Sequence, residues 1–125
     1  QNDGYYTGST SNYNTDGFTT NDILSIALDA DNNNVKLYKN GTVQNSGTAF
    51  NIGASYTGFW HFAFGDYDGG NAGSHSFQLN FGNPSFTISS NSGNGYTDAN
   101  NFGKFQYTVP SGYYSLCTQN LKTYG

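Results

Sequence analysis

The sequence predicts an all-β protein with antiparallel strands, arranged as a β-sandwich or jelly roll, and three observations lead to this fold class. The 125 residues include 11 tyrosines and 10 phenylalanines, and aromatic residues favour strands. Asn, Gly, Ser and Thr fill most polar positions, where they favour turns and weaken helices. Short stretches alternate apolar with polar residues, whereas none has a helical period of about 3.6 residues. A chain of this length forms one domain.

The chain begins with a polar stretch that has no apolar period. Residues 1–21 are rich in Gly, Ser, Thr, Asn and Tyr, so we expect an irregular lead-in, or the end of a preceding segment, ahead of a β-domain over residues 22–125. In that domain Leu24, Ile26 and Leu28 occupy every second position, which predicts a strand with one buried face. We expect these three side chains in the core.

A second strand follows and closes a hairpin. Val35 and Leu37 lie in this strand, and we expect Leu37 in the same core. Asn40-Gly41 ends the strand, because both residues tolerate the positive φ angles of a tight hairpin turn. With Thr42 the pair also matches a glycosylation acceptor, but the turn explains the motif without a sugar.

The connection between these two strands raises the question of a metal site. Residues 29–33, Asp-Ala-Asp-Asn-Asn, resemble the first half of a calcium-binding loop. Such a loop also needs a glycine at its sixth position and an acidic residue at its twelfth, where this chain has Asn34 and Asn40. We therefore predict a polar turn, in which Asx side chains bond to nearby backbone amides, and no calcium.

The second half of the chain predicts four further strands. Two aromatic stretches alternate, a polar excursion follows, and Pro110-Ser111-Gly112 separates the last two strands. The expected strands cover residues 57–64, 74–81, 105–109 and 113–118, with a glycine-rich loop at 65–71 and a surface loop at 84–104 that has short strand pieces around Phe86 and Ile88. Many short strands separated by turns favour a sandwich or jelly roll.

Several stretches resemble the SPRY domain family. Residues 22–32 followed by residues 35–41 resemble the central hairpin of SPRY domains, and Leu79-Asn80-Phe81-Gly82 looks like a late strand of the family. Residues 105–121 are similar to SPRY-like segments of bacteriophage structural proteins. The resemblance implies a SPRY-like, concanavalin-like β-sandwich that belongs to a phage-like assembly.

The chain departs from that family at its beginning. SPRY domains carry further strands before the block that starts at Asp22, and residues 1–21 offer no alternating pattern to replace them. Leu24-Ser25 also stands where many members have a glycine. We therefore expect the sandwich to lack its first strands, which a longer parent chain or a neighbouring subunit would supply.

Charge and composition exclude several classes of function. The net charge is −4, only 10% of the residues are charged, and there is no arginine, so we expect no binding to nucleic acid. The longest aromatic run, residues 59–64, is too short to cross a bilayer, and we expect no membrane association. The single cysteine cannot form an internal disulfide.

Candidate catalytic groups are few. Glycoside hydrolysis usually needs two carboxyl groups, and in this chain without Glu the nearest pair is Asp66 and Asp68, on a loop that lacks apolar surroundings. Cys117 with His61 or His75 is the alternative, but a cysteine in an apolar strand is usually buried and inert. We predict no catalytic site, no metal and no cofactor.

A sugar-binding cluster is the main functional alternative. Trp60, Asp66, Tyr67, Asp68 and Asn71 combine aromatic rings with hydrogen-bonding groups around the glycine-rich loop. If that loop folds over the end of the preceding strand, these residues would bind a glycan. The competing interpretation places Trp60 in the core, because tryptophan is highly buried on average.

These observations predict a non-enzymatic structural and surface-presentation module of a phage-like virion or extracellular fibre. Function in such folds resides in loops held by a rigid scaffold. The expected partners are copies of the chain or other subunits of the assembly, and host or matrix glycans if the chain is a lectin-like module instead. The expected location is a virion surface or the extracellular space.

Overall fold

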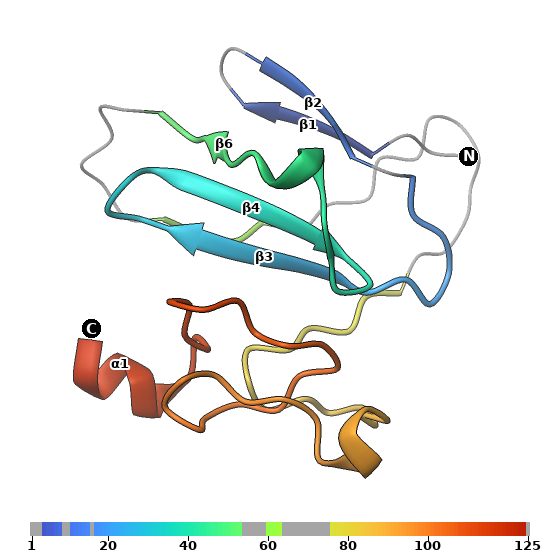
Figure 1. The fold of residues 1–125 in the computed structure, drawn as a ribbon, viewed down its shortest axis with the longest axis vertical. Helices are drawn as coiled ribbons and strands as arrows, with labels where there is room; N and C mark the ends of the chain where they lie inside the picture. The colour runs from blue at the N-terminus through green and yellow to red at the C-terminus, as the bar shows by residue number, and fades with distance from the viewer. Residues whose placement is uncertain (1–3, 9–10, 16, 54–59, 64–75, 125) are drawn as a thin grey trace.

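The computed structural model describes residues 4–8, 11–15, 17–53, 60–63 and 76–124, and its regular structure is mostly antiparallel β-sheet (Figure 1). The strands are β1 (Gly4–Gly8), β2 (Ser11–Thr15), β3 (Leu24–Asp29), β4 (Asn34–Lys39), β5 (Thr42–Val43) and β6 (Phe50–Asn51). The α-helix among the described residues is α1 (Thr118–Tyr124). The prediction of an all-β, antiparallel fold is confirmed at this level.

β1 and β2 form a two-stranded hairpin of their own at the start of the chain. They pair from Gly4 opposite Thr15 to Gly8 opposite Ser11. The expectation of irregular structure before residue 21 is therefore wrong for these two segments. A ladder needs only backbone groups that can pair, and Tyr and Thr suit extended backbone even where apolar residues do not alternate. The division of the chain into a lead-in and a domain stays a prediction.

The central sheet grows from the predicted hairpin. β3 pairs with β4 along its whole length, from Leu24 opposite Lys39 to Asp29 opposite Asn34. The other edge of β4 pairs with both β5 and β6. β3 is therefore the outer strand of this sheet among the described residues, and the C-terminal part of the chain lies on its side in Figure 1. The predicted hairpin is confirmed.

The most buried apolar row of the sheet lies at one end of one face. Phe50 of β6 is only 1% exposed and lies opposite Val35 of β4, which is also buried. Leu28 of β3 completes this row, because it pairs with Val35 from the other side. The other buried apolar residues of the described part are Ala27, which lies on the opposite face of β3, and Ile88 in the C-terminal half.

The predicted core positions of the hairpin are only partly correct. Alternation places Leu24, Ile26 and Leu28 on the same face as Phe50, yet Leu24 and Ile26 are 54% and 44% exposed. Leu28 and Leu37 are half-buried. The reason is that Leu28 shares its row with the apolar Val35 and Phe50, whereas Leu24 shares its row with the polar Lys39 and Thr42, so the end that carries Leu24 stays open.

The strands predicted for the second half are absent from its described residues. Residues 60–63 and 76–81 form no strand, and the rest of both predicted strands lies outside the described residues. In residues 84–117 the ladder contact is a single bridge between Tyr96 and Phe105. The last predicted strand ends in α1 instead. Apolar alternation produces a strand only where a partner pairs with it.

Two turns of the same sequence adopt the same uncommon backbone. Asn45–Gly47 and Asn91–Gly93 both read Asn-Ser-Gly, and all three residues of each turn have positive φ. In each turn the glycine N–H bonds to the carbonyl before the asparagine at 3.0 Å. Glycine adopts this conformation freely and asparagine tolerates it, whereas serine adopts it at a cost.

Candidate functional site

Of the predicted sugar-binding cluster, the structure describes Trp60. Its side chain is half-buried, so it is neither the fully buried core residue of one interpretation nor a freely exposed ring. Asp66, Tyr67, Asp68 and Asn71 lie outside the described residues. The cluster therefore stays a prediction.

The connection between β3 and β4 is a hydrogen-bonded polar turn. The Asp29 carboxylate accepts the backbone N–H of Asn32 at 3.0 Å and its side-chain amide at 2.8 Å. These bonds, the side-chain one first, lower the pKa of Asp29. Asn33 follows with φ at 52°. The predicted Asx turn is confirmed.

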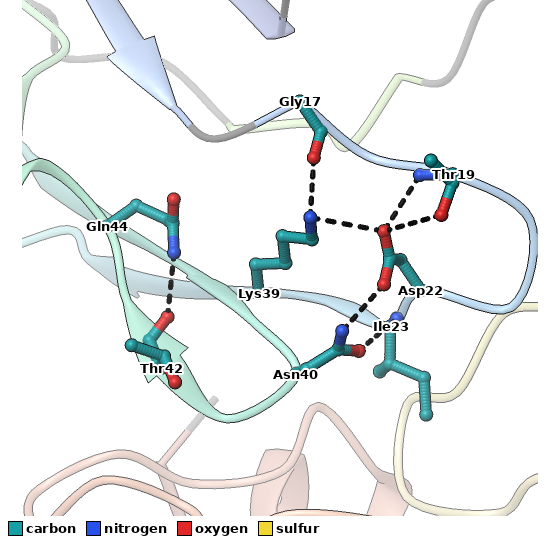
Figure 2. Close-up of polar contacts among 8 residues, drawn as sticks. All are labelled: Gly17, Thr19, Asp22, Ile23, Lys39, Asn40, Thr42 and Gln44. Carbon is teal, nitrogen blue, oxygen red and sulfur yellow. Dashed lines mark hydrogen bonds and ion pairs between the residues drawn. The ribbon is translucent and has the colours of Figure 1, made fainter. Parts of the chain in front are cut away.

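A second polar cluster ties the start of β3 to the tight turn after β4 (Figure 2). Asp22 lies 3.2 Å from the Lys39 ammonium and accepts hydrogen bonds from Thr19 N–H at 2.7 Å and the Asn40 amide at 2.6 Å. The Thr19 bond, followed by that of Asn40, lowers the pKa of Asp22 to about 2. The Asn40 oxygen accepts Ile23 N–H at 2.9 Å. Asn40 in the glycosylation-like motif thus has both ends of its side chain engaged by the fold.

A buried polar network surrounds Asp98, which is 5% exposed. One carboxylate oxygen accepts the backbone N–H groups of Asn100 and Phe102 at 2.9 and 3.0 Å. The other accepts the N–H and hydroxyl of Ser115 at 2.9 and 2.8 Å and the amide of Asn120 at 2.7 Å. The carboxylate therefore joins its own turn to the segment around Ser115 and to α1.

This environment keeps Asp98 ionised and chemically occupied. Burial raises the pKa of its carboxyl, but the backbone N–H groups of Ser115 and Phe102, helped by the side chains of Ser115 and Asn120, lower it to about 2. A carboxylate with all its acceptor sites filled is a poor general base. The network holds chain segments together and does not activate Ser115 as a nucleophile.

Cys117 lies directly before α1 and is half-buried, whereas the sequence predicted a buried thiol in a strand. Its sulfur is 3.3 Å from the Ser115 hydroxyl oxygen. This contact, followed by the backbone N–H groups of Asn120 and Gln119, lowers the pKa of the thiol. His61 is exposed and forms no hydrogen bond with Cys117, and His75 lies outside the described residues.

Sequence reasoning missed the Asp98 network. Asp98 is the only acidic residue in the last third of the chain and lies in Thr-Asp-Ala-Asn-Asn, a composition typical of an Asx turn. That signal predicts the local bonds to Asn100 and Phe102. It does not predict Ser115 and Asn120, which only the fold brings close. Over the part of the chain that the structure describes, no three His, Cys or Asp residues gather to hold a metal ion.

No family model, no curated protein and no solved structure matches this chain. The resemblance to SPRY domains therefore stays a prediction that rests on the sequence blocks. Among the described residues, none of the helices has the length and apolar character needed to cross a membrane.

Proposed function

We propose that this chain is a non-enzymatic structural and surface-presentation module of a phage-like virion or extracellular fibre, with a SPRY-like β-sandwich or jelly-roll fold. Its partners are copies of itself or other subunits of that assembly. The SPRY-like blocks around residues 22–41 and 105–121 support the family. The antiparallel pairing of β3 and β4 is compatible with it.

The observation that carries this proposal is the distribution of large apolar side chains. Four apolar residues of the described part are buried, whereas twelve large ones are exposed. The exposed set consists of Phe18, Leu24, Ile26, Phe62, Phe77, Leu79, Phe81, Tyr96, Phe102, Tyr114, Leu116 and Leu121. Monomeric soluble proteins rarely leave large contiguous apolar patches in water. Neighbouring subunits that cover such side chains gain about 25 cal/mol for each Å² removed from water.

Part of this apolar surface is grouped. The rings of Phe62 and Phe81 lie with their centroids 6.1 Å apart, and Phe77 and Leu79 precede Phe81 at alternate positions. Leu24 and Ile26 are exposed on β3, whose outer edge pairs with no other strand of the described part. Unpaired edges of this kind recruit strands from neighbouring chains.

The polar groups support a scaffold role in the same way. Asp22, Asp29 and Asp98 accept hydrogen bonds from the chain itself and fasten turns and segments. These carboxylates serve the fold itself, which supports the proposal of a presentation module.

Sedimentation velocity over a range of protein concentrations, together with negative-stain microscopy, tests the proposal. We expect oligomers or fibres whose population grows with concentration. A folded chain that stays monomeric throughout, with fully protected amides in its edge strands, would contradict it.

A glycan-array screen tests the lectin-like alternative. The half-buried Trp60 is the observation that keeps this alternative open, because its accessible part offers a surface for a sugar ring. Binding of a defined glycan that is lost in both Trp60→Ala and Asp66→Ala would favour the lectin-like function over the purely structural one.

A further inference from the structure

The chain contains two Asn-Gly pairs, and the fold holds their side chains very differently. Such pairs are prone to spontaneous deamidation, because glycine has no side chain to hinder attack of its nitrogen on the asparagine Cγ. One pair is Asn40-Gly41, in the turn after β4, and the other is Asn94-Gly95, just after the second Asn-Ser-Gly turn. We propose that Asn94 is a site of spontaneous deamidation and isoaspartate formation, and that the fold protects Asn40 from the same reaction.

Asn40 is held at both ends of its side chain. Its oxygen accepts the N–H of Ile23 at 2.9 Å, and its amide donates to the Asp22 carboxylate at 2.6 Å (Figure 2). Gly41, at φ +80°, is pressed against Tyr107, since a Cβ placed on it would lie 2.8 Å from the ring. The rotation that brings the Gly41 nitrogen to the Asn40 Cγ therefore breaks two hydrogen bonds, one of them to a charged group.

Asn94 has no such restraint. Its side chain is exposed and forms no hydrogen bond with the part of the chain that the structure describes. Its backbone N–H bonds to Asn91 at 3.0 Å, and the N–H of Gly95 donates to Ser90 at 3.1 Å. When the Gly95 nitrogen attacks, its hydrogen bond to the Ser90 carbonyl must break. The Asn94 side chain, however, is free to rotate its electrophilic Cγ toward that nitrogen.

The reaction needs only water and base. Hydroxide removes the Gly95 amide proton, the nitrogen bonds to the Asn94 Cγ, and the side-chain nitrogen leaves as ammonia, which closes a five-membered succinimide. Water then breaks one of the two ring bonds to the Gly95 nitrogen. Cleavage at Cγ leaves an aspartate, and cleavage at the main-chain carbonyl leaves an isoaspartate. Either product gains one negative charge, and no oxidant or cofactor takes part.

Isoaspartate changes the backbone at a tightly packed point. It inserts one methylene carbon into the main chain between residue 94 and Gly95. Gly95 is buried, and a Cβ placed on it would lie 2.8 Å from the Phe105 carbonyl oxygen and 3.0 Å from Ile88 Cγ2. Tyr96 and Phe105 are joined by backbone bonds of 2.8 and 2.9 Å. The longer backbone therefore displaces Tyr96 from this bridge.

Peptide mapping by mass spectrometry, after incubation of the folded protein in mildly alkaline ¹⁸O-water, tests the proposal. We expect Asn94 to take up heavy oxygen at least about tenfold faster than Asn40, because each net hydrogen bond changes an equilibrium by several-fold to about tenfold. In guanidinium, where neither side chain is held, the two rates should become similar. Equal rates in the folded protein, or a faster rate at Asn40, would overturn the proposal.

Two variants locate the cause. Asp22→Ala, or Asp22→Leu as the variant close to it in side-chain size, removes the acceptor of the Asn40 amide and should speed deamidation at Asn40 while leaving Asn94 unchanged. An unchanged Asn40 rate in both variants would refute the protective role of the Asp22 bond.

Hydrogen exchange on aged protein tests the structural consequence at Asn94. The backbone amides of Tyr96 and Phe105 should lose protection in aged wild type, and Asn94→Gln aged in parallel should keep it. Full protection in aged protein that contains isoaspartate would refute the structural consequence.

Discussion

At the scale of single residues, Asp98 replaces much of the backbone pairing that a sheet provides elsewhere in the chain. The segment around it has almost no ladder, so its buried N–H groups need other acceptors. One carboxylate supplies these for Asn100, Phe102 and Ser115. A buried charge is stable only when hydrogen bonds replace its lost hydration. Here the backbone N–H groups gain an acceptor, and the buried Asp98 carboxylate gains the hydrogen bonds that replace its hydration.

Replacement of Asp98 by Asn should therefore be strongly destabilising. The new amide presents N–H groups where the carboxylate accepted bonds, so buried donors from Ser115 and Asn120 lose their partner. We expect the free energy of unfolding, measured by urea titration, to fall by about 3 kcal/mol. Asp31→Asn, in the exposed turn between β3 and β4, is the matched control and should change it by less than about 0.5 kcal/mol. Equal effects of the two substitutions would refute the role of Asp98.

The Asp98 carboxylate should also make the free energy of unfolding depend on pH. Its folded-state pKa of about 2 lies below the ordinary value of 3.8, so the unfolded chain binds the proton more tightly. The contribution of Asp98 to the free energy of unfolding is therefore fully present above about pH 4, and it is lost as the pH falls through about 2. Urea midpoints measured down this range should fall more steeply for the wild type than for Asp98→Asn. Parallel curves would show that Asp98 does not titrate in this way.

The two Asn-Ser-Gly turns offer a stabilising substitution. Ser46 and Ser92 have φ of 51° and 54°, a conformation that costs a residue with a side chain roughly 1 kcal/mol and costs glycine almost nothing. Glycine also gains more entropy in the unfolded chain, which offsets part of this. We expect Ser46→Gly or Ser92→Gly to leave stability unchanged or raise it by up to about 0.5 kcal/mol. Ser25→Gly, inside β3, should instead lower the stability. Thermal melts of the three variants measure these changes in melting temperature against the wild type.

At the scale of elements, the hairpin of β3 and β4 was predictable because several local signals agree. Alternation, a polar Asx turn and an Asn-Gly turn all indicate the same two strands, and each acts over a few neighbouring residues. The hairpin β1–β2 lacks the apolar alternation that marks a strand, so it escaped the same reasoning. The aromatic stretch that ends in Leu79 and Phe81 has the alternation, but no partner strand among the described residues pairs with it.

The candidate sites divide in the same way. The turn that contains Asp29 was predictable, because its bonds join residues three apart. The Asp98 network was not, because its bond to Asn120 joins residues 22 apart and depends on how an irregular segment folds back. Burial was also unpredictable from alternation, which identifies a face but not how much of it another element covers.

The unequal cover of that face leads to a direct comparison of two substitutions. Phe50→Ala removes a fully buried ring and should lower the free energy of unfolding by about 3–5 kcal/mol. Leu24→Ala trims a side chain that is 54% exposed at the open end of the same face, so we expect a loss below about 1 kcal/mol in the isolated chain. Chemical denaturation of both variants measures the difference, and a Leu24 effect as large as that of Phe50 would show that the open end is covered.

At the scale of the whole molecule, the outer edge of β3 and the exposed apolar side chains both bear on the proposed assembly. The sequence led us to expect missing strands, and among the described residues β1 and β2 pair with each other and not with the central sheet. β3 remains the outer strand of the central sheet in the described part, with an uncharged apolar sequence from Ile23 to Leu28. Natural edges usually carry lysine, proline or a bulge that prevents pairing with other chains. This edge has no lysine and no proline.

A lysine placed on that edge should therefore weaken self-association without unfolding the chain. Ile26 is 44% exposed and central in β3, so Ile26→Lys puts a charge on the apolar face that we propose is covered by a neighbour, and the exposed site tolerates it at a cost of about 1 kcal/mol or less. Ser25→Lys adds the same charge one residue away on the opposite face and is the matched control. Sedimentation should shift Ile26→Lys toward monomer much more than Ser25→Lys, while circular dichroism stays unchanged for both. If Ile26→Lys associates as strongly as the wild type, this face is not where the copies meet.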